Sequence, residues 1–178
     1  MNARTRLLSL LRVESDPVDF DAVYRAEVTR VFNFFRYRVG DDQLAEDLTA
    51  ETFEKAWRNR ERYRRDRAAF STWLFTIARR VAVDHYRRRQ AVVSLEALSE
   101  LPAGEPTENA IQERVDFARL TALLAQLAEH DRELVALRYG AGLTNRAIAG
   151  LTGLSESNVA VLLHRVVQKL RGEWEEQR

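Results

Sequence analysis

The sequence has 178 residues, of which 28 are Lys or Arg and 27 are Asp or Glu, so its net charge at pH 7 is only +1. Helix-forming residues dominate and 46% of the residues are apolar, which favours an all-α globular chain of one or two domains. The lack of Cys excludes a disulfide framework and a thiolate zinc site, and it fits a protein of the reducing cytoplasm.

Residues 1–18 form a basic and apolar N-terminal extension. Its apolar run is interrupted by Ser9 and Arg12 and is too short for a signal peptide, and no run in the sequence reaches the length of a membrane span. We expect the extension either to be disordered or to be an added regulatory helix. Such a helix carries Leu7, Leu8, Leu10 and Leu11.

Two helices are expected next. The first runs from Phe20 to Val39, with Asp19 or Asp21 as its N-cap and Gly40 at its end. The second is capped by Asp41 or Asp42 and continues through Arg58. Three of its acidic residues share one face because they are spaced i, i+4 and i+7. They are Asp47, Glu51 and Glu54.

Acidic side chains repel DNA, so this face of the second helix is expected to meet a basic protein partner. An ordinary solvated acidic face is the alternative. The block from Arg58 to Arg89 has the opposite character, with eleven Arg residues. Its first part is expected to be a basic loop, and Ser71 is expected to cap a helix that ends near Arg89.

On that helix an aromatic and cationic face adjoins the core face. Its members are Trp73, Arg80, Asp84 and Arg87. Cations that follow a phosphate backbone, beside rings that stack on bases, suit single-stranded nucleic acid. A buried Trp beside a solvated Arg face is the alternative.

Residues 91–112 hold two of the three Pro residues and many Glu, and they are expected to be an acidic linker. Helices are predicted beyond it over Glu113–Ala128 and Asp131–Tyr139. The three His residues are scattered and no catalytic or metal-binding motif is present, so we expect neither an enzyme nor a cofactor or metal site.

The sequence from Gly142 to Arg171 predicts a helix-turn-helix. Thr144 can cap a short helix, Gly153 lies in the turn, and Ser155 can cap a second helix that would enter a DNA major groove. A plain αα-hairpin that binds nothing is the alternative. The residues expected to face DNA include Ser157, Asn158, Val161, Arg165 and Lys169.

The order of these parts is more informative than any one of them. "AEDLTAETFEKAW", a basic loop, "STWLFTIAR", a linker and a terminal helix-turn-helix together resemble a bacterial sigma factor of the extracytoplasmic-function (ECF) group. The resemblance implies two small helical domains joined by the acidic linker, the C-terminal one a helix-turn-helix. Residues 19–90 would dock on polymerase and melt the −10 promoter element, 91–112 would be the linker, and 113–178 would recognise the −35 element.

The resemblance also implies a role for individual residues. Docking on the β′ clamp helices of core RNA polymerase would involve Asp47, Leu48, Glu51, Phe53, Glu54 and Trp57. Single-stranded −10 DNA would be held by Tyr63, Arg65, Phe70, Trp73, Arg80, Asp84, Arg87 and Arg88. Duplex −35 DNA would be read by Ser157, Asn158, Val161, Arg165 and Lys169. The polymerase β subunit and an anti-sigma protein are the further implied partners.

The sequence departs from the family pattern at three places. Arg80 stands where members often have Asn, and Ala147 replaces a common Glu in the first helix of the helix-turn-helix. The recognition helix lacks two usual cations over residues 158–162. These departures imply a different −10 base preference and −35 contacts that are weaker, more apolar or directed at another sequence.

Two other kinds of protein remain open at this point. One is a free-standing helix-turn-helix regulator that binds duplex DNA without polymerase and uses its N-terminal half for dimerisation or ligand binding. The other is an antagonist that mimics a sigma factor.

Overall fold

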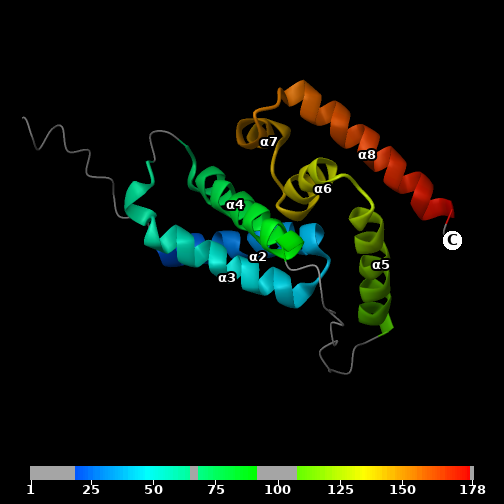
Figure 1. The fold of residues 1–178 in the computed structure, drawn as a ribbon, viewed down its shortest axis with the longest axis horizontal. Helices are drawn as coiled ribbons and strands as arrows, with labels where there is room; N and C mark the ends of the chain where they lie inside the picture. Colours follow the sequence, from blue (N-terminus) through cyan, green and yellow to red (C-terminus); the bar gives the residue numbers. More distant parts are fainter. Residues whose placement is uncertain (1–18, 65–67, 92–107, 177–178) are drawn as a thin grey trace, which may run out of the picture.

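The computed structural model describes residues 19–64, 68–91 and 108–176, and the regular elements in these ranges are all helical (Figure 1). The predicted all-α class is therefore confirmed. The expectations for residues 1–18 lie outside the described residues. The elements are α2 (Phe20–Val39), α3 (Asp42–Arg58), a 3-10 turn η1 (Arg60–Arg62), α4 (Phe70–Ala91), α5 (Glu108–Ala125), α6 (Glu129–Val135), a π-helical turn η2 (Ala136–Gly140), α7 (Asn145–Thr152) and α8 (Glu156–Glu176).

Helices α2 and α3 begin at predicted capping residues, α2 ends at the predicted Gly40, and α3 ends at Arg58 as predicted. The Asp19 carboxylate accepts a hydrogen bond from the backbone N–H of Ala22 (3.1 Å), and the Asp41 carboxylate accepts one from Leu44 (2.7 Å). Each bond satisfies an N–H that has no partner within the first turn. Gly40 ends α2 in the left-handed region at a φ of 72°, which favours glycine.

Helix α4 packs on α2 and α3. The prediction that Ser71 caps it is wrong, because the helix begins at Phe70 and the N–H of Trp73 already donates to the carbonyl of Ala69 (3.2 Å). Ser71 therefore lies inside the first turn. The residues of α4 that are fully buried are Leu74, Phe75, Ala78, Val81 and Ala82.

The second half of the chain begins earlier than predicted. Helix α5 starts at Glu108 rather than near Glu113, and one turn of it carries a side-chain hydrogen bond from Gln112 to Asp116 (3.0 Å). The helix predicted over Asp131–Tyr139 is divided into α6 and the π-helical turn η2.

Gly140, at the end of η2, lets this turn lie directly against α2. A Cβ atom on Gly140 would lie 2.7 Å from the carbonyl oxygen of Asn33 and 3.2 Å from the Cα of Phe34. Both are backbone atoms, so neither can turn aside. Nothing in the local sequence marks Gly140 for this role, because the approach joins elements that are distant in the chain.

Helices α7 and α8 form the predicted helix-turn-helix. Thr144 accepts from the N–H of Ala147 (3.2 Å), Gly153 ends α7 at a φ of 77°, and Ser155 Oγ accepts from the N–H of Asn158 (3.2 Å). All three predicted signals are confirmed. The buried face of α8 consists of Val159, Leu163 and Val166.

The two halves of the chain share one hydrophobic core. Helix α6 and η2 lie against α2, and α7 lies against α4 (Figure 1). Burial of apolar side chains from both halves in one core stabilises this closed arrangement. Its members include Phe34, Phe35 and Phe75 from the first half and Leu134, Leu137 and Ile148 from the second.

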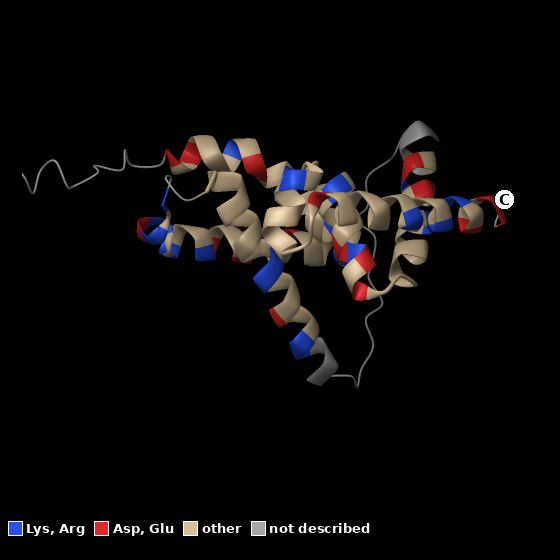
Figure 2. Cartoon of the chain, turned by 90° about the horizontal axis from the view of Figure 1, so that it is seen from above, with Lys and Arg blue, Asp and Glu red and all other residues tan. Residues whose placement is uncertain are grey.

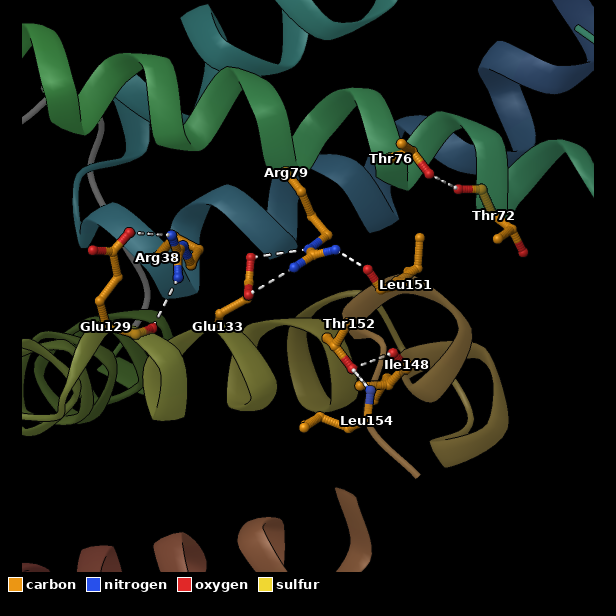
Figure 3. Close-up of polar contacts among 10 residues, drawn as sticks. All are labelled: Arg38, Thr72, Thr76, Arg79, Glu129, Glu133, Ile148, Leu151, Thr152 and Leu154. Carbon is orange, nitrogen blue, oxygen red and sulfur yellow. Dashed lines mark hydrogen bonds and ion pairs between the residues drawn. The ribbon is translucent and has the colours of Figure 1, made fainter. Parts of the chain in front are cut away.

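Several cation contacts cross between the halves, and Figure 3 shows those of Arg79 and Arg38. The Arg79 guanidinium of α4 donates to both carboxylate oxygens of Glu133 (3.0 and 3.1 Å) and to the backbone carbonyl of Leu151. Arg38 of α2, whose side chain is only 1% exposed, donates to the backbone carbonyl (3.1 Å) and the carboxylate (3.3 Å) of Glu129. Buried charges persist only when they are paired in this way.

Candidate functional site

The predicted acidic residues of α3 lie on one outer face of the N-terminal half. Asp47 and Glu54 are exposed, and Glu54 forms an ion pair with Arg58 of the next turn (2.6 Å). Glu51 is more enclosed and pairs with Lys55 (2.8 Å) and with Arg88 of α4 (3.5 Å). We call Asp47, Glu51 and Glu54 the acidic face.

The pKa of Glu51 reflects two opposed effects. Burial raises the pKa of its carboxyl, whereas the hydrogen bonds and charges of Lys55 and Arg88 lower it, and the net result lies below the ordinary value. Glu51 therefore remains ionised at neutral pH, and part of its charge is already balanced within the domain.

The apolar residues predicted beside the acidic face have different positions. Leu48 is 3% exposed and Phe53 is 6% exposed, so they hold α3 in the core and do not form its outer surface. Trp57 is 49% exposed, with its ring against Phe20 (5.0 Å between centroids) and the Arg60 guanidinium above it (4.2 Å). Trp57 is thus the aromatic residue presented at the end of this helix.

The aromatic residues predicted to hold −10 DNA form a packed cluster at the start of α4. The Tyr63 ring contacts Phe70 (5.1 Å) and Trp73 (5.3 Å), and its hydroxyl donates to the carbonyl of Ala68 (3.0 Å). Tyr63 is only 8% exposed, so its ring packs within the cluster and supports Phe70 and Trp73, and its contact with −10 DNA stays a prediction. Phe70 and Trp73 are half-buried, so part of each side chain remains accessible. Arg65 lies outside the described residues.

The remaining predicted −10 residues lie along the outer side of α4, whose C-terminal part projects from the body of the molecule (Figure 2). Arg80, Arg87 and Arg88 are exposed, and we call them the cationic face. Asp84 on the same helix is half-exposed and lies 3.9 Å from Lys55 of α3. With the Arg88–Glu51 contact, this pairing places the cationic face of α4 directly beside the acidic face of α3.

The predicted −35 residues share the outer side of α8. Ser157, Asn158, Val161, Arg165 and Lys169 are all exposed, and Val161 is 64% exposed. Val161 is a single exposed apolar side chain, so its exposure leaves it accessible but does not by itself mark a contact position. The structure therefore places all five predicted residues on the accessible side of α8.

Sequence reasoning missed the residues that hold the two halves together: Arg38, Arg79, Glu129, Glu133 and Gly140. Their partners are separated by 54 residues or more for the ion pairs, which leaves no local pattern to find. Within the described residues no helix is long and apolar enough to span a membrane, and the same residues hold no group of three or more His, Cys, Asp or Glu placed to bind a metal.

Comparison with known proteins identifies both halves. The Sigma-70 region 2 family matches residues 23–92, and the Sigma-70 region 4 family matches residues 117–170. The ECF RNA polymerase sigma factor BldN of Streptomyces coelicolor is 31% identical over 170 residues, which cover 93% of this chain but only 64% of BldN. The ECF sigma factor SigM of Bacillus subtilis is 29% identical, with 85% of this chain and 92% of SigM aligned.

Solved structures show the same fold. The sigma factor RpoE of Bartonella quintana, in complex with the anti-sigma factor NepR, matches with a TM-score of 0.70 and 22% identity over 90% of this chain and 99% of RpoE. CnrH, in complex with the cytosolic domain of CnrY, matches with a TM-score of 0.65 and 22% identity over 97% of this chain and 98% of CnrH.

A region 2 fold followed by a region 4 helix-turn-helix defines a sigma factor of bacterial RNA polymerase. Within that class, the chain belongs to the ECF group, as the order of its motifs predicted. A free-standing helix-turn-helix regulator is not favoured, because that class of protein does not explain why α2, α3 and α4 match Sigma-70 region 2.

Proposed function

We propose that this chain is a dissociable specificity subunit of RNA polymerase that works in the cytoplasm. It binds core polymerase, recognises the −35 and −10 promoter elements and melts the −10 region, while the chemistry of RNA synthesis belongs to the polymerase. The observation that carries the proposal is the juxtaposition of the acidic face of α3 and the cationic face of α4. One small domain can thereby hold a basic protein partner and a DNA strand side by side.

In this proposal residues 19–90 dock on core polymerase and melt the −10 element. Residues 91–112 link the two domains, and residues 113–178 recognise the −35 element. The acidic face meets basic residues of the β′ clamp helices, and complementary charge fixes both partner and register. Trp57 supplies the large, partly exposed aromatic side chain that commonly anchors an interface. The β subunit is the second expected contact on polymerase.

The −10 strand lies along α4. Its phosphates contact the cationic face, and an unstacked base stacks on the accessible part of the Phe70 or Trp73 ring, against which Tyr63 packs. Stacking on an aromatic ring contributes about 1–3 kcal/mol per base, which offsets the cost of flipping a base out of the duplex.

Replacing Arg80 and Arg87 with Ala is expected to weaken binding of polymerase holoenzyme to single-stranded −10 DNA in a salt-dependent way. Each lost phosphate contact reduces the slope of log K against log salt by about 0.7 on a single strand, so the pair lowers it by about 1.4. Fluorescence titrations at several salt concentrations measure this slope. Arg25→Ala with Arg171→Ala, two exposed Arg residues elsewhere, is the matched control; an unchanged slope in the first variant contradicts the assignment.

The −35 duplex is read by α8. Asn158 can donate hydrogen bonds to adenine and accept them from it, Val161 can contact a thymine methyl group, and Arg165 and Lys169 suit phosphates.

The two promoter elements lie about 25 base pairs, or about 85 Å, apart at 3.4 Å per pair. A globular chain of this length has a radius of gyration of about 16 Å. The closed arrangement is too small to reach both elements, so the two domains separate on the promoter.

An anti-sigma protein is a further proposed partner. RpoE and CnrH, which share this fold, were both solved with a protein bound. The closed arrangement of the two domains is the form that an inhibitory partner would hold, since it keeps the −10 and −35 surfaces too close together for a promoter.

Co-elution with purified bacterial core polymerase, followed by promoter opening on a library of DNA fragments, tests the proposal. The expected result is a stable complex that opens a defined subset of fragments. Duplex binding without co-elution contradicts the proposal in favour of a free-standing regulator. Co-elution without any opening contradicts it in favour of an antagonist that mimics a sigma factor.

A further inference from the structure

A groove between α2 and α3 lies beside the acidic face. Its volume is about 310 Å³, and its apolar lining includes Val28 and Phe32 of α2 and Phe53 of α3. Tyr24, which is 46% exposed, forms one wall with its ring edge-on to Phe53 (4.8 Å). Glu46 stands on the opposite wall and is exposed. The groove is therefore shaped for an apolar side-chain row with cations beside it.

The groove and the acidic face are adjacent surfaces of one helix. At about 100° per residue, Glu46, Ala50 and Trp57 lie within about 40° of one another on α3, on the groove side. Asp47 and Glu54 follow within about the next 80°. A helix seated in the groove would consequently stand against Glu54 and Trp57, where polymerase is proposed to dock.

Residues 1–18 of the chain have the matching composition. Wound as a helix, Leu7, Leu8, Leu10 and Leu11 fall within one arc of about 160°, with Arg6 and Arg12 at its two edges. An apolar stripe bordered by cations complements an apolar groove that has Glu46 on one wall and the acidic face beyond it, and such a stripe docks in the manner of a helix in a groove.

The stretch of chain between the four leucines and the groove is short enough to favour docking and long enough to permit it. Six residues, 13–18, separate the leucines from Asp19, and six extended residues span about 20 Å. Tyr24 lies one turn into α2, and the groove continues to Phe32, about 12 Å further along the helix axis. Pro17 disfavours helix at the residue before it, so the chain can reverse there.

We propose that residues 1–18 dock in the groove between α2 and α3 and compete there with core polymerase for α3. The docking rests on the groove and on the sequence of the segment, whereas the competition also rests on the proposed function. A tethered segment acts at a high effective concentration, so even weak contacts suffice to occupy the groove much of the time.

Paramagnetic relaxation on the full chain tests the docking. Because the sequence has no Cys, Ser9→Cys provides a single site for a nitroxide, on the helix side opposite the leucines. The amide signals of Thr29 and Ala50 in the groove wall are expected to lose most of their intensity, while that of Ala160 on α8 is retained. The double change Leu8→Asp with Leu11→Asp should restore the groove signals. Asn2→Asp with Thr5→Asp adds the same charge away from the leucines and should leave the loss unchanged.

Four results overturn the docking: no loss in the groove, equal loss at Ala160 and in the groove, a loss that survives the two leucine changes, or a loss that arises only between labelled and unlabelled chains. The last result assigns the groove to a second copy of the protein. The broadening is measured without polymerase, so this test of the docking is independent of the proposed function.

Polymerase titration tests the competition. The Leu8→Asp and Leu11→Asp chain is expected to bind core polymerase about fivefold tighter than the unaltered chain, the ratio for a segment that occupies the groove about four-fifths of the time. Equal affinities overturn the competition. Groove broadening in a chain that never binds polymerase would leave the docking intact and overturn the proposed function instead.

Discussion

Replacing Asp47 and Glu54 with Arg is expected to weaken binding to core RNA polymerase by at least about 30-fold. Loss of one partner from a charge pair at an interface costs about 2 kcal/mol or more, and 1.4 kcal/mol corresponds to a tenfold change in affinity. Reversal adds repulsion from the basic partner. Both residues are exposed on α3, so the fold itself should keep its stability within about 1 kcal/mol, most of the change coming from the i,i+4 pair of Glu54 with Arg58.

The choice of residues matters for this experiment. Glu51 is left unaltered because it pairs with Lys55 and Arg88, and its reversal would disturb the contact between α3 and α4. Glu113→Arg with Asp116→Arg on α5 makes the same change in net charge at two exposed positions of the other domain. Affinity from fluorescence titration and thermal unfolding are measured for both variants. Equal affinity of the two variants for polymerase would show that the acidic face is not the docking site.

The parts of the fold that sequence predicted are those governed by local chemistry. Asp19, Asp41, Thr144 and Ser155 were predictable caps because the bond that defines a cap joins residues three apart. Ser71 was a misleading signal of the same kind, since a serine near a helix start can also lie within the first turn.

Sequence predicted which segments form the candidate site, but it did not predict which of their side chains are exposed. Similarity to a family assigned Leu48, Phe53 and Tyr63 to binding surfaces, yet all three are buried. A matched motif holds both the residues that make contact and the residues that support them, and only packing separates the two. For Tyr63 the burial depends on Phe70 and Trp73, which belong to the next helix.

The contacts between the domains were beyond sequence reasoning altogether. In the sequence Arg79 is one of several cations in a basic helix, and Glu133 is one of several acidic residues in a different helix. Only the folded chain brings them within 3.0 Å of each other, in the arrangement in which Gly140 of η2 lies against the backbone of α2. The same contacts bear on function, since the promoter elements are too far apart for the closed form.

Reversing the charge of Arg79 is expected to separate the two domains. In Arg79→Glu two carboxylates face each other, and Glu133 is left only 11% exposed without its cation. Loss of one partner from a buried ion pair costs about 3–5 kcal/mol; since the Arg79 side chain is 25% exposed, we expect the lower end, about 3 kcal/mol against the closed form. Once the domains part, water can solvate both charged groups, so the open form does not bear this cost.

Small-angle scattering measures the separation as a rise in the radius of gyration, and circular dichroism checks that the helices persist. Arg80→Glu is the matched control, because the neighbouring side chain is exposed on the same helix and should leave the radius unchanged. The double change Arg79→Glu with Glu133→Arg restores opposite charges and should restore the closed radius. A merely misfolded single variant would lose helicity and would not be rescued. If Arg79→Glu kept the closed radius and the original stability, the pair would have no part in holding the domains together. The shared apolar core and the remaining cation contacts, such as that of Arg38 with Glu129, would then have to be overcome when the protein engages a promoter.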